Sequence, residues 1–525
     1  MQFDVIVIGS GPAGTSAALP LVRSGKKVLM LDWGNKSDNS VPSQSHYDSR
    51  ESDDKQSNWM IGKDLFSLKN NSSVSPKLRI PTLEYVFRDF EKSFSVDSDN
   101  FFYTGSMATG GLSNAWGAGV AALSPANLIK EYGSAYREML TSYANVSPRL
   151  GISGSNADKL STYFNVDRWA DKGVDLDDLP KYILEEYDNK SESSDVVLGR
   201  ARIAVLSKPK DERKKCDSLG NCLWGCKNES IYSAKYEMRS LMKSSNFKVI
   251  NGVAVTNIKS NENRVYVSGF DQNGGEITFD AHSVFLGAGT LSTSKILVKS
   301  LAIRNSELRI QSCPTAAFLL FVPRFFGRKV SKSEFGLGQV SFKVKLTKKL
   351  DGFGSFFGTQ GLPLYEFVRH LPIGISSGAR FLSSIINSCM VGNLFLPGTL
   401  STSKMIVDER GEISLSGSYD DSYRKLGSNA KTKLVKQFAR MKCFMVPFSF
   451  KFTEPGACIH YASTFPISDS NEIGTCRKSG EVVGLKNVYV VDGASLPSLS
   501  EKSHTLTIMA NSDRIARNYI SRAHK

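Results

Sequence analysis

Several absences in this 525-residue sequence exclude broad classes of protein. No uninterrupted apolar run reaches the ~18 residues that suggest a membrane-spanning helix. The nearest candidate, 371–396, is broken by Arg380, Asn387 and Asn393, and we expect it to belong to a substrate domain or its rim. The first residues carry no basic leader, apolar segment or cleavage site typical of a signal peptide. Only eight cysteines occur, which does not indicate a disulfide scaffold. We therefore expect a cytoplasmic protein.

Basic residues outnumber acidic residues, which gives the chain a formal net charge of +15. The basic residues are scattered along the chain, and the densest cluster, 208–215, also contains acidic residues. No nucleic-acid-binding motif or stripe of basic and aromatic residues is present, so we expect no nucleic-acid partner. We interpret the charge mainly as solvated surface. Peripheral contact with an anionic membrane, a lipid-linked glycan or an acidic substrate stays open.

The N-terminal residues follow the pattern of a β-α-β unit, with apolar strands at 3–8 and 27–31 and a helix at 12–24. Gly9, Gly11 and Gly14 form G-x-G-x-x-G between the first strand and the helix. These glycines permit a tight turn, close approach of a pyrophosphate, and close packing of the helix on the strand. Asp32 ends the second strand, where a carboxylate accepts hydrogen bonds from ribose hydroxyls. This unit predicts dinucleotide binding but does not separate NAD from FAD.

Three later segments have recognisable patterns. Residues 247–286 alternate apolar and polar side chains and contain Asn-Gly pairs at 251 and 273, which predicts a small antiparallel meander. The segment 282–297 reads as a strand, a glycine turn and a helix. Residues 487–491 and 505–520 predict a last strand and a last helix.

These segments and three further ones resemble the glucose-methanol-choline (GMC) family of FAD-dependent oxidoreductases. The turn with Gly287 and Gly289 is similar to the family's second glycine signature, and the segment around Val255 to the one whose backbone meets adenine. The run 487–520 resembles the family's closing signature, in which Asp492 and Gly493 approach the pyrophosphate and ribityl chain. The closing signature is not typical of NAD-dependent reductases, so the resemblance implies FAD.

The segment 110–119, GGLSNAWGAG, is similar to the family's glycine-rich flavin loop. The resemblance implies that Gly111 and Trp116 lie at the flavin and that Asn114 donates a hydrogen bond to it. Some members carry a histidine before the tryptophan that bonds covalently to the flavin. Ala115 occupies that position here, so the resemblance implies dissociable, non-covalent FAD.

The segment 456–466, GACIHYASTFP, resembles the family's histidine motif, usually His-Pro-x-Gly-Thr, with its proline and glycine replaced. The resemblance implies that His460 is the base that takes a hydroxyl proton while the flavin takes the hydride. A second active-site residue is expected on the turn before the last helix, where Ser503 occupies the family position and His504 is the better partner chemically. In that case we expect Ser503 to cap the helix.

The resemblance implies oxidation of a CH–OH group, and we expect a sugar or other polyol-like alcohol as substrate. The aromatic-rich stretch 303–455 supports this, since sugar faces stack on aromatic rings. The sequence does not specify the electron acceptor. The alternative is a non-catalytic flavoprotein that acts as an FAD-containing binding protein.

The implied fold class is mixed α/β, with a Rossmann-like FAD-binding domain and a second, antiparallel-sheet substrate domain. We expect the FAD-binding domain to comprise 1–125, 201–302 and 456–525, with a substrate-domain excursion at 126–200 and the substrate domain at 303–455. Cys216, Cys222 and Cys226 have C-x5-C-x3-C spacing, which is not a zinc pattern and has no evident fourth ligand. We expect a reduced loop and no metal.

Overall fold

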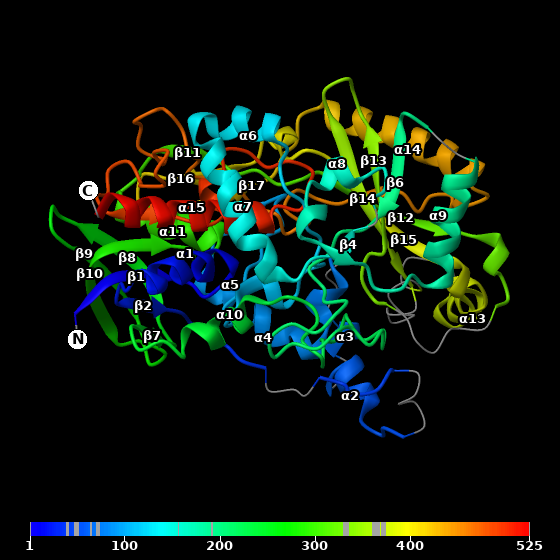
Figure 1. Ribbon diagram of the computed structural model, residues 1–525, viewed down its shortest axis with the longest axis horizontal. Helices are drawn as coiled ribbons and strands as arrows, with labels where there is room; N and C mark the ends of the chain where they lie inside the picture. The colour runs from blue at the N-terminus through cyan, green and yellow to red at the C-terminus, as the bar shows by residue number, and fades with distance from the viewer. Residues whose placement is uncertain are drawn as a thin grey trace.

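The protein is described by a computed structural model covering residues 2–37, 41–46, 52–63, 66–69, 74–155, 157–190, 193–328, 335–359, 368 and 374–523. Two seven-stranded sheets stand at opposite ends of the molecule (Figure 1). The first strand, β1 (Phe3–Ile8), belongs to the first sheet, and the last helix, α15 (Thr505–Ala523), lies beside that sheet. Within the described part of the chain, no helix is long and apolar enough to cross a membrane.

The first sheet has the strand order β7-β2-β1-β10-β9-β8, with β20 beside β10. The strands around β1 are parallel, whereas β8, β9 and β10 form an antiparallel meander. The expected strand at 3–8 is confirmed. The observed meander has one strand fewer than expected. The strand β7 is not part of it, because β7 pairs in parallel with β2 instead of with its neighbour along the chain. The strands are β2 (Val28–Leu31), β7 (Phe247–Ile250), β8 (Ala254–Ser260), β9 (Val265–Phe270), β10 (Glu276–Leu286) and β20 (Val488–Val490).

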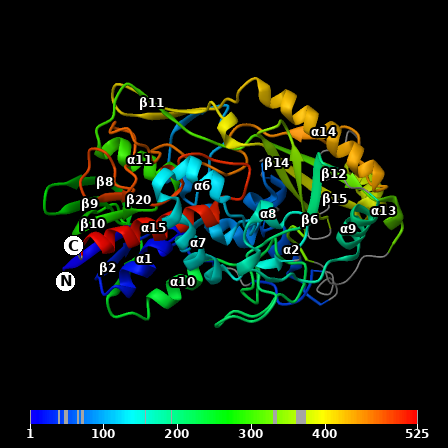
Figure 2. The same cartoon turned by 45° about the horizontal axis from the view of Figure 1, so that its top comes forward.

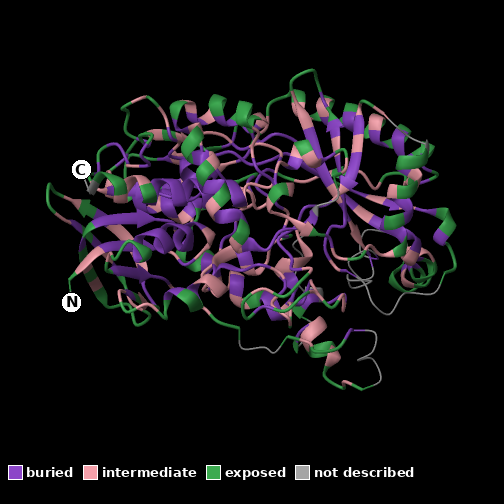
Figure 3. Cartoon of the chain, viewed as in Figure 1, coloured by how far each residue is buried: buried purple, intermediate pink, exposed green. Residues whose placement is uncertain are grey.

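Helices α1 (Pro12–Arg23) and α15 pack against each other beside this sheet (Figure 2). Pro12 suits the first position of α1, where a missing N–H costs no hydrogen bond. The Ser512 hydroxyl donates to the Ala13 carbonyl at 2.6 Å, so the two helices lie close together. Buried residues concentrate in the strands and between these helices (Figure 3).

The second sheet is antiparallel and has the order β18-β12-β15-β14-β13-β6, with β19 beside β12. Helices α9 (Asp178–Lys190) and α14 (Ser422–Arg440) pack on it. Phe318, Phe342 and Phe356 of the sheet contact Phe438 of α14, with ring centroids 5.5 to 6.3 Å apart. The strands are β6 (Val196–Arg200), β12 (Thr315–Phe321), β13 (Val340–Lys345), β14 (Asp351–Gly358), β15 (Cys389–Phe395), β18 (Phe444–Met445) and β19 (Lys451–Phe452).

The interrupted apolar run at 371–396 forms α13 (Ile375–Ile385) and β15 of the second sheet, while 371–373 lie outside the described residues. The predicted mixed α/β fold, with a parallel Rossmann-like sheet and an antiparallel second sheet, is confirmed.

The remaining strands are β3 (Asp97–Asp99), β4 (Ser153–Ser155), β5 (Asp171–Lys172), β11 (Ser306–Arg309), β16 (Lys404–Val407) and β17 (Ile413–Ser416). The remaining helices include α2 (Gln56–Met60), α3 (Phe66–Lys69), α4 (Glu84–Phe87), α5 (Phe90–Ser93), α6 (Pro125–Tyr132), α7 (Tyr136–Leu150), α8 (Ser161–Phe164), α10 (Ala234–Leu241) and α11 (Thr290–Ser300).

Candidate active site

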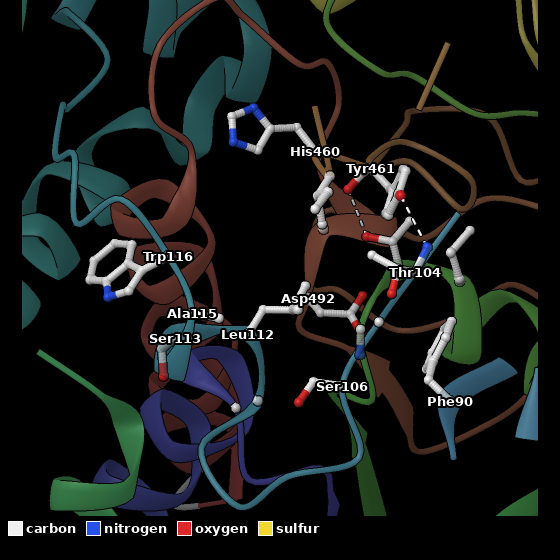
Figure 4. Close-up of a pocket in the computed structure, with 18 of the residues that line it drawn as sticks. Phe90, Thr104, Ser106, Leu112, Ser113, Ala115, Trp116, His460, Tyr461 and Asp492 are labelled. Atoms are coloured by element: carbon white, nitrogen blue, oxygen red, sulfur yellow. Dashed lines mark hydrogen bonds between the residues drawn. The ribbon is translucent and has the colours of Figure 1, made fainter. Parts of the chain in front are cut away.

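A cavity of about 1010 Å³ is lined by residues of both sheets and of the loops around them. Figure 4 shows His460 and Trp116 on one side of it and Phe90 and Thr104 on the other. Gly14 and Asn114 do not belong to its wall. The wall contains the other residues predicted from the sequence: Gly9, Gly11, Asp32, Gly111, Trp116, Val255, Gly287, Gly289, His460, Asp492, Gly493, Ser503 and His504.

The glycines of the first turn differ in what a side chain would meet. Gly9 has φ +95°, and a Cβ there would lie 2.4 Å from the Gly287 carbonyl oxygen. A Cβ on Gly14 would lie 1.8 Å from the Gly9 oxygen, so this glycine permits packing inside the protein. A Cβ on Gly11 would meet only the Gly111 Cα, at 3.9 Å. The space in front of Gly11 therefore belongs to the cavity, at the N-terminus of α1, which fits a pyrophosphate.

Asp32 lies at the end of β2 and accepts hydrogen bonds from the backbone N–H groups of Ser10 and Gly34, at 2.7 and 2.9 Å. Burial raises the pKa of this carboxyl group to about 6, and the hydrogen bond from Ser10 opposes the rise. The carboxyl group is thus fixed in the cavity wall at the end of the second strand. This is the position in which such a carboxylate accepts ribose hydroxyls.

Asp492 is committed to contacts within the protein. It accepts hydrogen bonds from the Gly289 N–H at 2.8 Å, the Thr293 hydroxyl at 2.5 Å and the Ala494 N–H at 3.0 Å. Burial raises the pKa of its carboxyl group to about 6. These bonds tie the closing segment to the second glycine turn. Gly493 follows at a position where a Cβ would lie 2.5 Å from the Thr290 hydroxyl oxygen.

Asn114 shapes the glycine-rich loop from within. Its amide donates to the carbonyls of Thr109 and Gly111, both at 2.9 Å, and accepts from the Ser233 hydroxyl at 2.8 Å. Both amide hydrogens are therefore used inside the loop, in contrast to the expected donation to the flavin. Trp116 lies in the cavity wall and donates its ring N–H to the Tyr232 carbonyl at 2.8 Å.

Two histidine rings meet in the cavity wall. The centroids of His460 and His504 are 4.6 Å apart and the ring planes meet at 77°. Phe395 of β15 stacks on His460 at 5.2 Å. Burial lowers the pKa of His460 to about 4, and burial followed by the charge of His460 holds the pKa of His504 well below its ordinary value. Both rings are therefore neutral near pH 7, and the buried Nδ1 of His504 has no hydrogen-bond partner among the described residues.

Comparisons with known proteins agree with this geometry. A family model described as GMC oxidoreductase matches residues 449–512, which include the histidine segment and most of the closing segment. A model described as FAD binding domain matches residues 4–57. These two matches, at the two ends of the chain, support the resemblance to the GMC oxidoreductase family.

The two matches bear out the predicted FAD-dependent oxidoreductase acting on CH–OH groups. Its fold is similar to that of pyridoxine 4-oxidase from Mesorbium loti, with a TM-score of 0.62 and 13% sequence identity over 100% of both chains. At this identity the likeness concerns the fold alone. No curated protein matches the sequence.

The turn before α15 holds Ser503 and His504, the two residues that the resemblance offers for the second active-site position. Ile508 donates its backbone N–H to the His504 carbonyl at 2.9 Å, so His504 holds the N-cap position. The expectation that Ser503 caps this helix is therefore wrong. Ser503 instead lies against Gly119, where a Cβ would be 2.7 Å from the Ser503 hydroxyl oxygen. Both Ser503 and His504 line the cavity.

The second sheet supplies a part of the cavity wall that no motif indicated. Asn393 accepts a hydrogen bond from the Ser355 N–H at 2.7 Å, and the hydroxyls of Ser355 and Ser341 are 2.9 Å apart. Phe353 and Phe357 of β14 line the same wall. The alternation of side chains along β13, β14 and β15 is the signal that places these residues on one face.

The cysteine loop carries no metal site in the part of the chain that the structure describes, where no group of three or more histidine, cysteine or acidic side chains is placed to hold an ion. Burial raises the pKa of the Cys216 thiol to about 11, and the Cys222 thiol is shifted further in the same direction. These thiols are therefore protonated near pH 7.

Proposed function

We propose that this GMC oxidoreductase oxidises a hydroxyl group of a sugar or polyol-like alcohol, with His460 as the base. The observation that carries the proposal is the pair of neutral histidine rings, 4.6 Å apart, in the same cavity as the glycine turn of the dinucleotide unit. Bound FAD supplies the acceptor for the hydride that leaves the carbon. The protein supplies the base and the orientation of the hydroxyl group.

His460 takes the proton of the substrate hydroxyl in this proposal. A base must be unprotonated before it acts, and burial lowers the pKa of His460 to about 4, so its ring is available near pH 7. Phe395 stacks on the ring and limits its orientation. As the proton leaves, negative charge develops on the substrate oxygen, which requires a donor nearby.

We favour His504 as that second group. Its Nδ1 is buried and without a partner among the described residues, and its ring faces His460. Ser503 is the alternative, because its hydroxyl also lies in the cavity wall. A serine would hold the substrate oxygen by a hydrogen bond, whereas a histidine would also share the proton.

The wall of the second sheet supports a polyol-like substrate. Ser341, Ser355 and Asn393 offer hydroxyl and amide groups, and Phe353 and Phe357 offer ring faces. Burying such polar groups costs free energy unless a ligand or the protein pairs them. Several phenylalanines of this region, including Phe318, Phe342 and Phe356, lie in the core under α14, so the aromatic content of the sequence is weaker support than these five positions.

We propose that FAD is held without a covalent bond. Ala115 lines the cavity at the position where the family's attachment histidine would stand, and a methyl group cannot form that bond. The pyrophosphate would lie at Gly11 and the ribose at Asp32. The adenine would meet the backbone near Val255, where the pairing of β8 with β9 shifts register. We also propose the domain division predicted from the sequence, in which 1–125, 201–302 and 456–525 bind FAD and 126–200 and 303–455 form the substrate domain.

Anaerobic mixing tests the function. The FAD-loaded protein is mixed with sugars, glycosides, long-chain alcohols, sterols and pyridoxine while the flavin absorbance is followed. We expect one class of alcohol to bleach the flavin. His460→Ala should retain FAD and slow the bleaching by roughly 100-fold or more. Normal bleaching in that variant excludes His460 as the base, and a flavin that no alcohol bleaches favours a non-catalytic binding protein.

A further inference from the structure

Lys77 is a cation in the cavity wall without a counter-charge. It lies in the 3-10 helix Pro76–Arg79, and its side chain lines the cavity. Its ammonium group has no hydrogen bond or ion pair with any residue that the structure describes. Burial lowers the pKa of Lys77 to about 8, and of the titratable groups only the Cys222 thiol acts in the opposite direction.

Two other cations of the cavity wall have partners within the protein. Arg202 forms ion pairs with Asp158 at 2.8 Å and Asp167 at 2.7 Å, so its charge is balanced within the protein. Lys295 donates to the Ser93 carbonyl at 3.3 Å. An ammonium group removed from water without a partner is costly, and buried charges are normally paired. Lys77 is half-buried in the cavity wall and has no such partner among the described residues, so an anion bound in the cavity would supply one.

The position of Lys77 separates it from the pyrophosphate end of the cavity. It shares an electrostatic interaction with Cys222 but none with Asp32. Cys222 packs on Gly336, where a Cβ would lie 3.0 Å from the Cys222 Cβ. Gly336 lies in the cavity wall two residues before Gly338, where a Cβ would lie 3.3 Å from the Ser355 Cβ. This chain of contacts leads from Lys77 to the wall of the second sheet.

Several apolar residues line the same cavity as Lys77. Leu112, Ala115 and Leu223 line the cavity with it and offer no acceptor side chain. An anionic oxygen group in this environment would form a charge-assisted hydrogen bond, which is about twice as strong as a neutral one. The net charge of +15 also raises the local concentration of anions around the molecule.

We propose that Lys77 is an anion subsite of the substrate pocket and that the alcohol substrate carries a carboxylate or phosphate group which binds there. The inference that the bound anion is part of the substrate rests on the proposed alcohol oxidation. Binding of an anion at Lys77 does not depend on that oxidation, and it can be tested without turnover.

The first test measures binding to the FAD-loaded protein with two probes that share a ring and a hydroxymethyl group, 4-(hydroxymethyl)benzoate and benzyl alcohol. Binding is followed by the change in the flavin spectrum. We expect the carboxylate probe to bind roughly tenfold or more tightly than benzyl alcohol. Lys77→Met should remove this preference and Lys77→Arg should retain most of it.

Lys92→Met is the matched control, because it removes the same charge from a side chain that is 88% exposed and paired only with Asp89. This control should keep the preference of the parent protein. A preference that survives Lys77→Met, or one that is absent from the parent protein, overturns the subsite. If Lys77→Met weakens FAD binding and leaves the probe preference unchanged, Lys77 serves the phosphates of FAD and the proposal is wrong.

The second test is site-resolved and uses trace acetylation of the FAD-loaded protein read by peptide mass spectrometry. Inorganic phosphate and 4-(hydroxymethyl)benzoate should each slow the labelling of Lys77, whereas benzyl alcohol should not. Lys92 serves as the internal reference. Protection by phosphate alone assigns a phosphorylated substrate, and protection by the benzoate assigns a carboxylate. A labelling rate that no anion changes refutes the subsite, whether or not an alcohol bleaches the flavin.

Discussion

Replacing Gly11 by alanine separates FAD binding from folding. Gly11 has φ −66° and ψ −178°, which any residue adopts, and its Cβ would meet only the Gly111 Cα at 3.9 Å. The reduced freedom of the unfolded chain should stabilise the apoprotein by about 0.4–1 kcal/mol. The same methyl group would occupy the space expected for the pyrophosphate. Overpacking by one methyl group costs about 1–3 kcal/mol, so the Kd for FAD should rise by roughly 5- to 150-fold.

Gly14→Ala provides the contrast, because its Cβ would lie 1.8 Å from the Gly9 backbone oxygen. That clash is inside the protein, so the apoprotein itself should unfold at a lower temperature. The assay combines thermal unfolding of the apoproteins with FAD titration followed by quenching of the flavin fluorescence. Parental FAD affinity in Gly11→Ala would show that the pyrophosphate lies elsewhere. A loss of apoprotein stability equal to that of Gly14→Ala would show that Gly11 serves packing.

Three further predictions concern the flavin and the histidines. Acid precipitation should release all flavin into the supernatant, because Ala115 cannot bond to it, and colour in the pellet would contradict this. Flavin reduction should stay level as the pH falls below 6.5 and decline only near pH 4, because His460 must be neutral and burial lowers its pKa to about 4; a decline centred on 6.5 would refute this. His504→Ala should slow reduction by roughly tenfold or more, whereas Ser503→Ala should change the rate little. The reverse pattern would assign the second position to Ser503.

The dinucleotide unit was predictable in detail because its constraints are steric and local. A strand, a turn with positive φ at Gly9 and a helix that packs through Gly14 leave few alternatives, and the strand at 3–8 was predicted with its observed bounds. The pairing of β7 was not predictable in the same way. Its partner β2 lies more than two hundred residues away, and the nearby Asn-Gly pair favoured a hairpin.

The cap of α15 shows how a local preference fails by one residue. Serine is a better N-cap residue than histidine, so the sequence favoured Ser503. The helix starts one residue later, and the first intrahelical bond is accepted by the His504 carbonyl. This start of the helix places the His504 ring against His460, with ring centroids 4.6 Å apart, as the proposed mechanism requires.

The recognition half of the site depends on contacts between distant segments, which local patterns do not encode. Ser355 and Asn393 lie on strands in which polar and apolar side chains alternate, and in such strands the polar side usually faces solvent. Lys77 was one of 66 basic residues whose scatter we interpreted mainly as a solvated surface. Its half-buried position in the cavity wall, without a partner among the described residues, is a property of the folded chain. The motifs therefore identify the redox chemistry, and we propose that the polar groups of the folded cavity specify its substrate.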